Sequence, residues 1–141
     1  MIHYQGIDVE VPRELTVYDS LWVDKIISNY NRKTGEVFFL FCSDEYLYQM
    51  NVSFLEHDTY TDIITFDQSD HNNIIRAELY ISLDRIKDNA QKMQVDWLYE
   101  LRRVMAHGVL HLIGFTDKNP CEQIEMRRQE ELCLSLLTEI H

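Results

Sequence analysis

The stretch HGVLHLIGFTD, residues 107 to 117, holds two histidines four residues apart, then a glycine and a carboxylate. On an α-helix, residues i and i+4 lie on one face about one turn apart, so His107 and His111 can offer both imidazoles to one ion. Gly114 suits the left-handed conformation that commonly ends a helix, and the chain can fold back there to bring Asp117 toward the rings. Three protein ligands with one open position are typical of a catalytic zinc site.

The simpler interpretation is an ordinary amphipathic helix with two histidines and an acidic turn. Against it, the helix is strongly apolar, and two polar rings within it need partners that a metal would supply. The spacing also matches the metzincin protease pattern H-E-x-x-H-x-x-G-x-x-H, with Asp117 at the position of the third histidine. Gly108 replaces the glutamate that is the general base in those proteases. The pattern therefore predicts a metzincin-like metal-binding helix, but not a peptidase of that kind.

Outward from this helix, the 141 residues suit a single domain spanning 1–141. Hydrophobic periodicity, capping residues and turn residues predict the elements. The expected strands span residues 2–11, 36–42, 61–67 and 74–82, and the expected helices run through residues 21–33, 44–52, 83–93, 97–114 and 120–140. We expect Thr16 or Asp19 to cap the first helix and Gly35 to end that helical unit. The first strand is expected at an edge of the sheet, and the strand 61–67 is expected to pair with the strand 74–82 as a hairpin. This order predicts an α+β fold, a mixed sheet of about four strands with helices segregated on it.

The composition limits location and partners. A net charge of −11 opposes strong non-specific binding to nucleic acid, but it does not exclude a local basic groove. The chain shows neither a membrane span nor a signal-like N-terminus, so we expect a cytoplasmic protein without a membrane partner. Three cysteines without C-x-x-C spacing predict reduced thiols, with Cys42 and Cys133 in core elements and Cys121 unpaired.

Four segments resemble one family. HGVLHLIGFTD is similar to the H-G-x-L-H-L-x-G-Y-D-H motif of the YbeY family, metal-dependent endoribonucleases of ribosomal RNA maturation. HDTYTDIITFD resembles that family's D-x-x-T-D-V-L-S-F segment, and RAELYIS stands where the family usually has G-D-I-x-I-S. Met126 and Glu130 fit its M-x-x-x-E pattern in the closing helix. The segments occur in the family's order, from about Leu47 to the C-terminus, roughly two thirds of the chain.

The departures from the family pattern are specific. Asp117 stands at the position of the family's third histidine ligand, Thr116 replaces the aspartate before it, and Phe115 replaces a tyrosine. Leu55 occupies a position where the family commonly has an arginine. If that arginine contacts RNA phosphate, this chain must use another cation, or its activity is altered.

The resemblance implies a single-strand-specific zinc-dependent endoribonuclease acting in ribosomal RNA processing, including small-subunit 3′-end maturation, and in ribosome quality control. Its partners would be precursor RNA and the small ribosomal subunit or assembly factors. One Zn²⁺, or nickel or another first-row metal, would be bound by His107, His111 and Asp117. It would assist attack on the phosphodiester by an activated water or the ribose 2′-OH. Arg76 is a candidate phosphate contact, unless it is merely a surface charge on a hairpin, and Asp62 falls in the matched strand segment.

Two other classes of function stay open. One is a metallohydrolase of a small-molecule or peptide substrate, which the acidic composition favours. The other is a ribosome-associated assembly factor whose metal is mainly structural.

Overall fold

The computed structural model describes residues 1–55, 61–70 and 73–140. Four strands are present in this part of the chain: β1 (Ile2–Gly6), β2 (Lys33–Cys42), β3 (Ile63–Asp67) and β4 (Ile74–Ser82). The helices are α1 (Val17–Asn29), α2 (Asp44–Leu55), α3 (Leu83–Met93), α4 (Trp97–Ile113), α5 (Pro120–Ser135) and α6 (Leu137–Ile140).

The strands form one mixed sheet in the order β1-β2-β4-β3. β1 pairs parallel to β2 and β2 parallel to β4, whereas β3 and β4 form an antiparallel pair with Ile64 opposite Tyr80. The predicted α+β class, the four-stranded sheet, the edge position of the first strand and the hairpin are confirmed.

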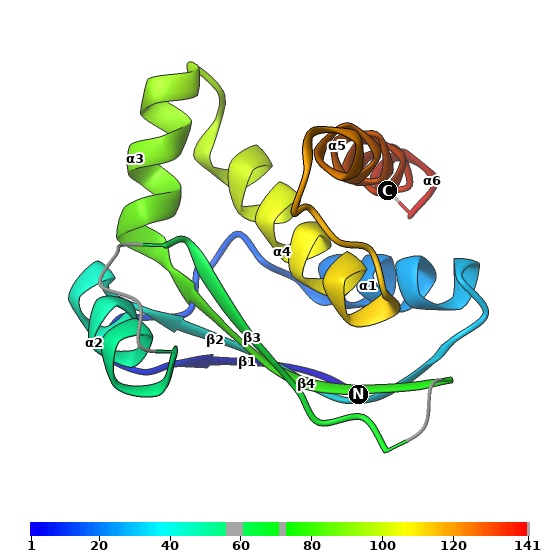
Figure 1. Ribbon diagram of the computed structural model, residues 1–141, viewed down its shortest axis with the longest axis horizontal. Helices are drawn as coiled ribbons and strands as arrows, with labels where there is room; N and C mark the ends of the chain where they lie inside the picture. The colour runs from blue at the N-terminus through cyan, green and yellow to red at the C-terminus, as the bar shows by residue number, and fades with distance from the viewer. Residues whose placement is uncertain (56–60, 71–72, 141) are drawn as a thin grey trace.

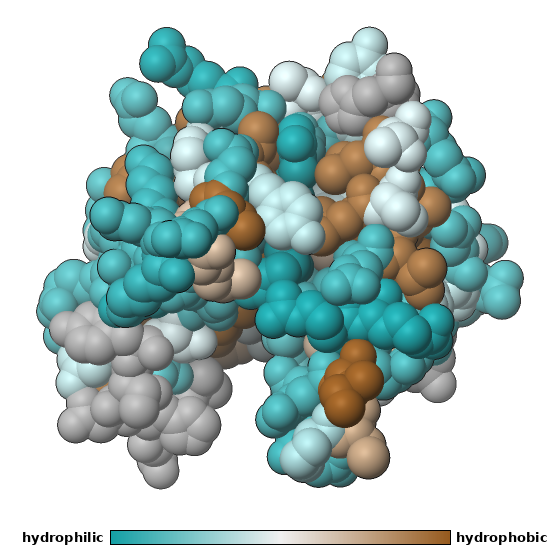
Figure 2. All heavy atoms as spheres, turned by 90° about the horizontal axis from the view of Figure 1, so that it is seen from above, coloured by the Kyte–Doolittle hydropathy of each residue, from teal (hydrophilic) through white to brown (hydrophobic). Residues whose placement is uncertain are grey.

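The two faces of the sheet carry different helices (Figure 1). Alternate residues of β2 and β4, such as Phe39 and Leu79, join the main core with α1 and α4. On the opposite face, Leu47 and Met50 of α2 pack against Ile64 in a smaller cluster. The period-2 alternation of each strand therefore buries both faces, one under most of the helices and one under α2. Seen from above, the surface is mostly hydrophilic with hydrophobic side chains in separate patches (Figure 2).

α4 is the helix that the opening motif predicted. The Asp96 side chain caps its first turn by accepting from the backbone N–H of Leu98 at 3.1 Å. It ends at Gly114, whose φ of 129° is one that residues with a Cβ rarely adopt. Between these ends most of its apolar residues are buried, so the helix is held firmly over the sheet.

Some boundaries differ from those expected. Thr16 is the N-cap of α1, and Asp19 completes the capping box rather than competing for the cap. Gly35 does not end that helical unit but lies within β2. A Cβ there would meet the Ile75 carbonyl oxygen at 2.9 Å, so the glycine allows close strand packing, and Asn31, at φ 61°, makes the turn. The first strand ends at Gly6, and the last helix is broken at Leu136.

The cysteines are free and Cys42 and Cys133 are buried, as predicted, and Cys121 is exposed. Among the described residues, no helix combines the length and the apolar character that crossing a bilayer requires.

Candidate metal centre

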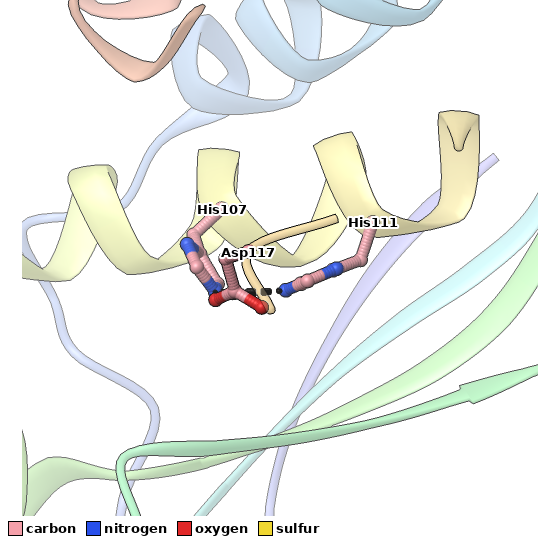
Figure 3. Close-up of side chains that lie close together, drawn as sticks. All are labelled: His107, His111 and Asp117. Carbon is pink, nitrogen blue, oxygen red and sulfur yellow. Dashed lines mark hydrogen bonds and ion pairs between the residues drawn. The ribbon is translucent and has the colours of Figure 1, made fainter. Parts of the chain in front are cut away.

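Three side chains converge below the C-terminal half of α4 (Figure 3). The Nε2 atoms of His107 and His111 lie 3.0 Å apart. Asp117 Oδ2 lies 3.4 Å from the first of these nitrogens and 3.6 Å from the second. The turn after Gly114 therefore brings the carboxylate back to the rings, and the structure places the three predicted ligands together.

The donor set fits a small divalent cation. Zinc bonds of about 2.0–2.1 Å in a tetrahedral site put ligand atoms roughly 3.3 Å apart, close to the three separations here. His111 Nδ1 lies 3.0 Å from the Phe115 carbonyl oxygen, which can only accept, so this nitrogen carries the proton. His107 Nδ1 lies 2.6 Å from Glu130 Oε2 and donates to that carboxylate. Both Nε2 atoms then present lone pairs to one point, where a divalent cation would accept both.

Glu130 belongs to a buried charged network. Arg103 donates to both carboxylate oxygens of Glu100 at 2.8 Å and to Glu130 Oε1 at 2.9 Å. Burial alone would raise the pKa of Glu130, but the hydrogen bonds from His107 and Arg103 hold that pKa below its ordinary value. The carboxylate is therefore ionised at neutral pH and fixes the orientation of the His107 ring.

The turn that carries Asp117 is held by the first turn of α5. The Glu122 carboxylate accepts from the Thr116 hydroxyl at 2.7 Å and from the Lys118 backbone N–H at 2.9 Å. The Gln123 side-chain amide donates to the Asp117 carbonyl at 3.2 Å. These bonds hold the backbone on both sides of Asp117, the third candidate ligand.

Gly108 packs directly on the sheet. A Cβ at this position would lie 2.6 Å from Leu79 Cδ2 and 2.7 Å from Ile63 Cδ1. A side chain at the position that holds the general base in metzincins would therefore have to displace Leu79 and Ile63 here. Glycine at this position allows close contact between α4 and the strands β3 and β4.

A cavity of about 260 Å³ opens at this centre. It is lined by Arg103, His107, Asp117, Gln123, Met126, Arg127 and Glu130. Both residues of the M-x-x-x-E pattern therefore face the cavity. Asp62 lies near enough to His107 and Arg103 for their charges to lower its pKa, but burial is the larger effect and raises the pKa above its ordinary value.

Arg76 is not brought to this cavity. Its neighbours Ile75 and Ala77 point into the main core, so the strand alternation turns Arg76 to the opposite face of the sheet. There it pairs with Asp70 at 3.5 Å. Its role as a phosphate contact stays a prediction. Residues 57–60 of the matched segment lie outside the described residues, and so does the side chain of Leu55.

Sequence reasoning singled out Glu130 by its motif but assigned it no role. It did not find Arg103, Glu100, Arg127 or the Phe115 carbonyl as parts of the site. The spacing of Glu100 and Arg103, three residues apart on one helix, was a readable signal for an ion pair. The contact of Arg103 with Glu130 joins residues 27 apart, so only the packing of α5 on α4 reveals it.

Comparisons with known proteins indicate the family of this chain. The family model for YbeY, described as Endoribonuclease YbeY, matches residues 9–138. A protein of Cytophaga hutchinsonii named Endoribonuclease YbeY is 49% identical over 115 residues, covering 82% of this chain and 80% of the relative. A protein of Parabacteroides distasonis with the same name is 40% identical over 138 residues, covering 98% and 96%.

A solved structure supports the fold. A Thermotoga maritima protein determined in solution superposes with a TM-score of 0.71 at 23% identity, covering 97% of this chain and 89% of that one. The match of the family model over nearly the whole length, the identities of 40% and 49%, and this shared fold lead to one conclusion: the chain belongs to the YbeY family.

Proposed function

We propose that this chain is a single-strand-specific, zinc-dependent endoribonuclease that acts in the cytoplasm on ribosomal RNA precursors. Its roles would be small-subunit 3′-end maturation and ribosome quality control, with the small subunit or assembly factors as partners. Membership of a family of endoribonucleases supports hydrolysis of RNA phosphodiesters. The observation that carries the proposal is the convergence of His107, His111 and Asp117, whose ligand atoms all lie within 4.8 Å of one another.

A divalent cation at this centre would supply Lewis acidity toward a water molecule and a phosphoryl oxygen. The chain's own contribution is to present two Nε2 lone pairs and one carboxylate oxygen in fixed positions. Glu130 and the Phe115 carbonyl hold the rings, and Glu122 holds the turn before and after Asp117. The cavity leaves space beside His107 and Asp117 for a phosphodiester, which water or the ribose 2′-OH would attack.

The peptidase alternative is disfavoured by Gly108. Metzincin proteases need a glutamate at that position, whereas this chain has a glycine there that packs against Leu79 and Ile63. A small-molecule metallohydrolase is favoured by the net charge of −11 but not by the family to which the chain belongs.

Cleavage of a ribosomal RNA precursor by the zinc-loaded protein, compared with its His111→Ala variant, tests the proposal. We expect the variant to lose more than about 100-fold in rate, because removing a ligand should cost more than the 10–100-fold typical of its outer partners. Equal cleavage by both proteins would mean a contaminating nuclease and would overturn the proposal. A duplex of the same sequence should be cleaved poorly, because only unstacked strands can enter such a cavity.

The metal and its third ligand are tested separately. Metal analysis of the purified wild type should give one ion per chain, with zinc reconstituting the chelated protein more effectively than nickel. Asp117→Ala should lose the ion, and Asp117→His should retain it. Because a carboxylate donates more charge than imidazole, the His variant should reach half-maximal rate at a lower pH. An Asp117→Ala variant that retains the ion at full affinity would remove Asp117 from the ligand set.

Chelation separates the enzyme from an assembly factor with a structural metal. α4 is anchored by its apolar side, through buried residues such as Val104 and Val109. We therefore expect the chelated wild type to keep its far-UV circular dichroism and a cooperative thermal transition while losing cleavage. Unfolding on chelation would favour an assembly factor with a structural metal, because a structural ion contributes directly to the free energy of folding.

A further inference from the structure

Two arginines line the metal cavity, and they differ in what they already contact. Arg103 is committed to Glu100 and Glu130 through three hydrogen bonds of 2.8–2.9 Å, and its side chain is only 13% exposed. Arg127 is 53% exposed, and its guanidinium lies 3.7 Å from Glu130 Oε1. That oxygen already accepts from Arg103, so the pair with Arg127 is long and the positive charge of Arg127 remains available at the mouth of the cavity.

A second hollow adjoins the first along α5. It measures about 400 Å³ and is lined by Pro120, Gln123, Ile124 and Arg127. Gln123 and Arg127 line both hollows, so these two residues form the boundary between the metal cavity and its neighbour. Ile124 is 72% exposed, which leaves an apolar surface beside the guanidinium.

The chemistry of this surface suits one nucleotide of a single strand. A chain of net charge −11 repels RNA at long range, so contact with the backbone needs a local cation. A guanidinium binds phosphate through paired N–H groups, and an apolar side chain beside it can accept the face of a base or sugar. An exposed cation and an exposed apolar side chain next to the ligand cluster meet both requirements.

We propose that residues 120–127 of α5 form a nucleotide subsite next to the metal centre, with Arg127 contacting the phosphate that neighbours the scissile one. Ile124 receives the base or sugar of that nucleotide. This inference rests on the proposed function, because it names how the same site binds its single-stranded RNA.

The test compares Arg127→Gln with Arg128→Gln in the zinc-loaded full-length chain. Arg128 is the matched control: it is the next residue, it is 59% exposed, and it pairs with both oxygens of Glu125 at 2.7 and 3.0 Å. With a single-stranded ribosomal RNA fragment, Arg127→Gln should raise KM several-fold with little change in kcat. The salt dependence of RNA binding should weaken by about 0.7 in the slope of log K against log salt, the loss of one phosphate contact. Arg128→Gln should change neither, and Arg127→Lys should recover part of the loss.

The outcomes separate the two proposals. Failure of the wild type to cleave or bind the RNA would overturn the proposed function itself. A wild type that cleaves, together with an Arg127→Gln variant whose KM and salt slope equal those of Arg128→Gln, would overturn the subsite alone. Loss of zinc or of thermal stability in Arg127→Gln, with an unchanged salt slope, would also overturn it, because Arg127 would then act through Glu130 rather than on RNA.

Discussion

At the scale of single residues, the hydrogen bond between Glu130 and His107 fixes the ring of a candidate metal ligand. Glu130→Gln keeps an oxygen at this place but removes the charge that stabilises the donating Nδ1–H. We expect zinc affinity to fall by about 10–100-fold, the usual effect of losing an outer partner of a histidine ligand. Competition with a chromophoric chelator measures the affinity.

The neighbouring carboxylate supplies the control for this substitution. Glu131 is exposed and one residue further along α5, so Glu131→Gln makes the same change in net charge without touching the site. Equal zinc affinities of the Glu130 and Glu131 variants would contradict the role given to Glu130.

Gly108 is a second residue whose identity is set by packing. Alanine normally stabilises a helix interior by about 1 kcal/mol relative to glycine. Here the added methyl group would meet Leu79 and Ile63 at 2.6 and 2.7 Å, and forcing it in should cost about 1–3 kcal/mol. We therefore expect Gly108→Ala to have a lower free energy of unfolding in urea than the wild type. A variant at least as stable as the wild type would contradict this expectation, because the side chains of Leu79 and Ile63 would then move aside without cost.

At the scale of elements, α1 and α4 are joined by a buried ion pair. Asp19 Oδ1 accepts from Arg102 Nε at 2.9 Å, and Oδ2 accepts from the Thr16 backbone N–H at 2.9 Å. Asp19 is fully buried, so Asp19→Ala removes the capping box and leaves Arg102 without its partner. We expect a loss of about 3–5 kcal/mol in the free energy of unfolding.

Asp24, on the exposed side of the same helix, provides the comparison. Asp24→Ala should change the free energy of unfolding by less than about 0.5 kcal/mol, as surface substitutions usually do. Both values come from urea titration of the chelated proteins, so that metal binding does not enter. Similar losses in the two variants would mean that the ion pair contributes nothing beyond surface charge.

Whether each element is a helix or a strand could be predicted from the local sequence, but the residues at which it begins and ends could not always be predicted. The apolar period of α4, its Asp96 cap and its terminal glycine were all readable from neighbouring residues. The prediction that Gly35 ends the first helical unit was wrong. A glycine after a helix often marks its end, but this one lies in β2 and packs against β4. The close approach of two strands is a tertiary contact, so no local pattern could reveal it.

At the scale of the whole molecule, the two buried thiols should make the free energy of unfolding fall at alkaline pH. Burial raises the pKa of both Cys42 and Cys133 to about 12, from an ordinary value near 9 in the unfolded chain. The folded state therefore retains protons that the unfolded state loses, and stability is full below pH 9 and declines above it. We expect a fall of about 1.4 kcal/mol per thiol between pH 8 and pH 10.

Urea titration at several pH values measures this fall, and the double variant Cys42→Ala, Cys133→Ala should show a much flatter profile over the same range. Cys121 is exposed and should react with a thiol reagent in the folded protein, whereas the other two should react only on unfolding. Equal slopes for the wild type and the double variant would rule out the thiols as the cause.

The sequence by itself determined the class of fold, the helix that carries the two histidines, and the family. The fold class and the helix depend on periodicity and on spacing within a short stretch, and the family depends on motifs that are each short. His107, His111 and Asp117 lie within eleven residues, and a helix followed by a glycine turn is enough to bring them together. Local spacing fixes these relations before any other element packs.

Only the tertiary structure decided what surrounds the three ligands. It showed that Glu130 orients His107, that Arg103 holds Glu130, that Arg127 borders the cavity, and that Arg76 lies on the far face of the sheet. These relations join residues far apart in the chain, or depend on which face of a strand is covered. They come from how α5 packs on α4 and how α4 packs on the sheet, and no pattern within a single element encodes that packing.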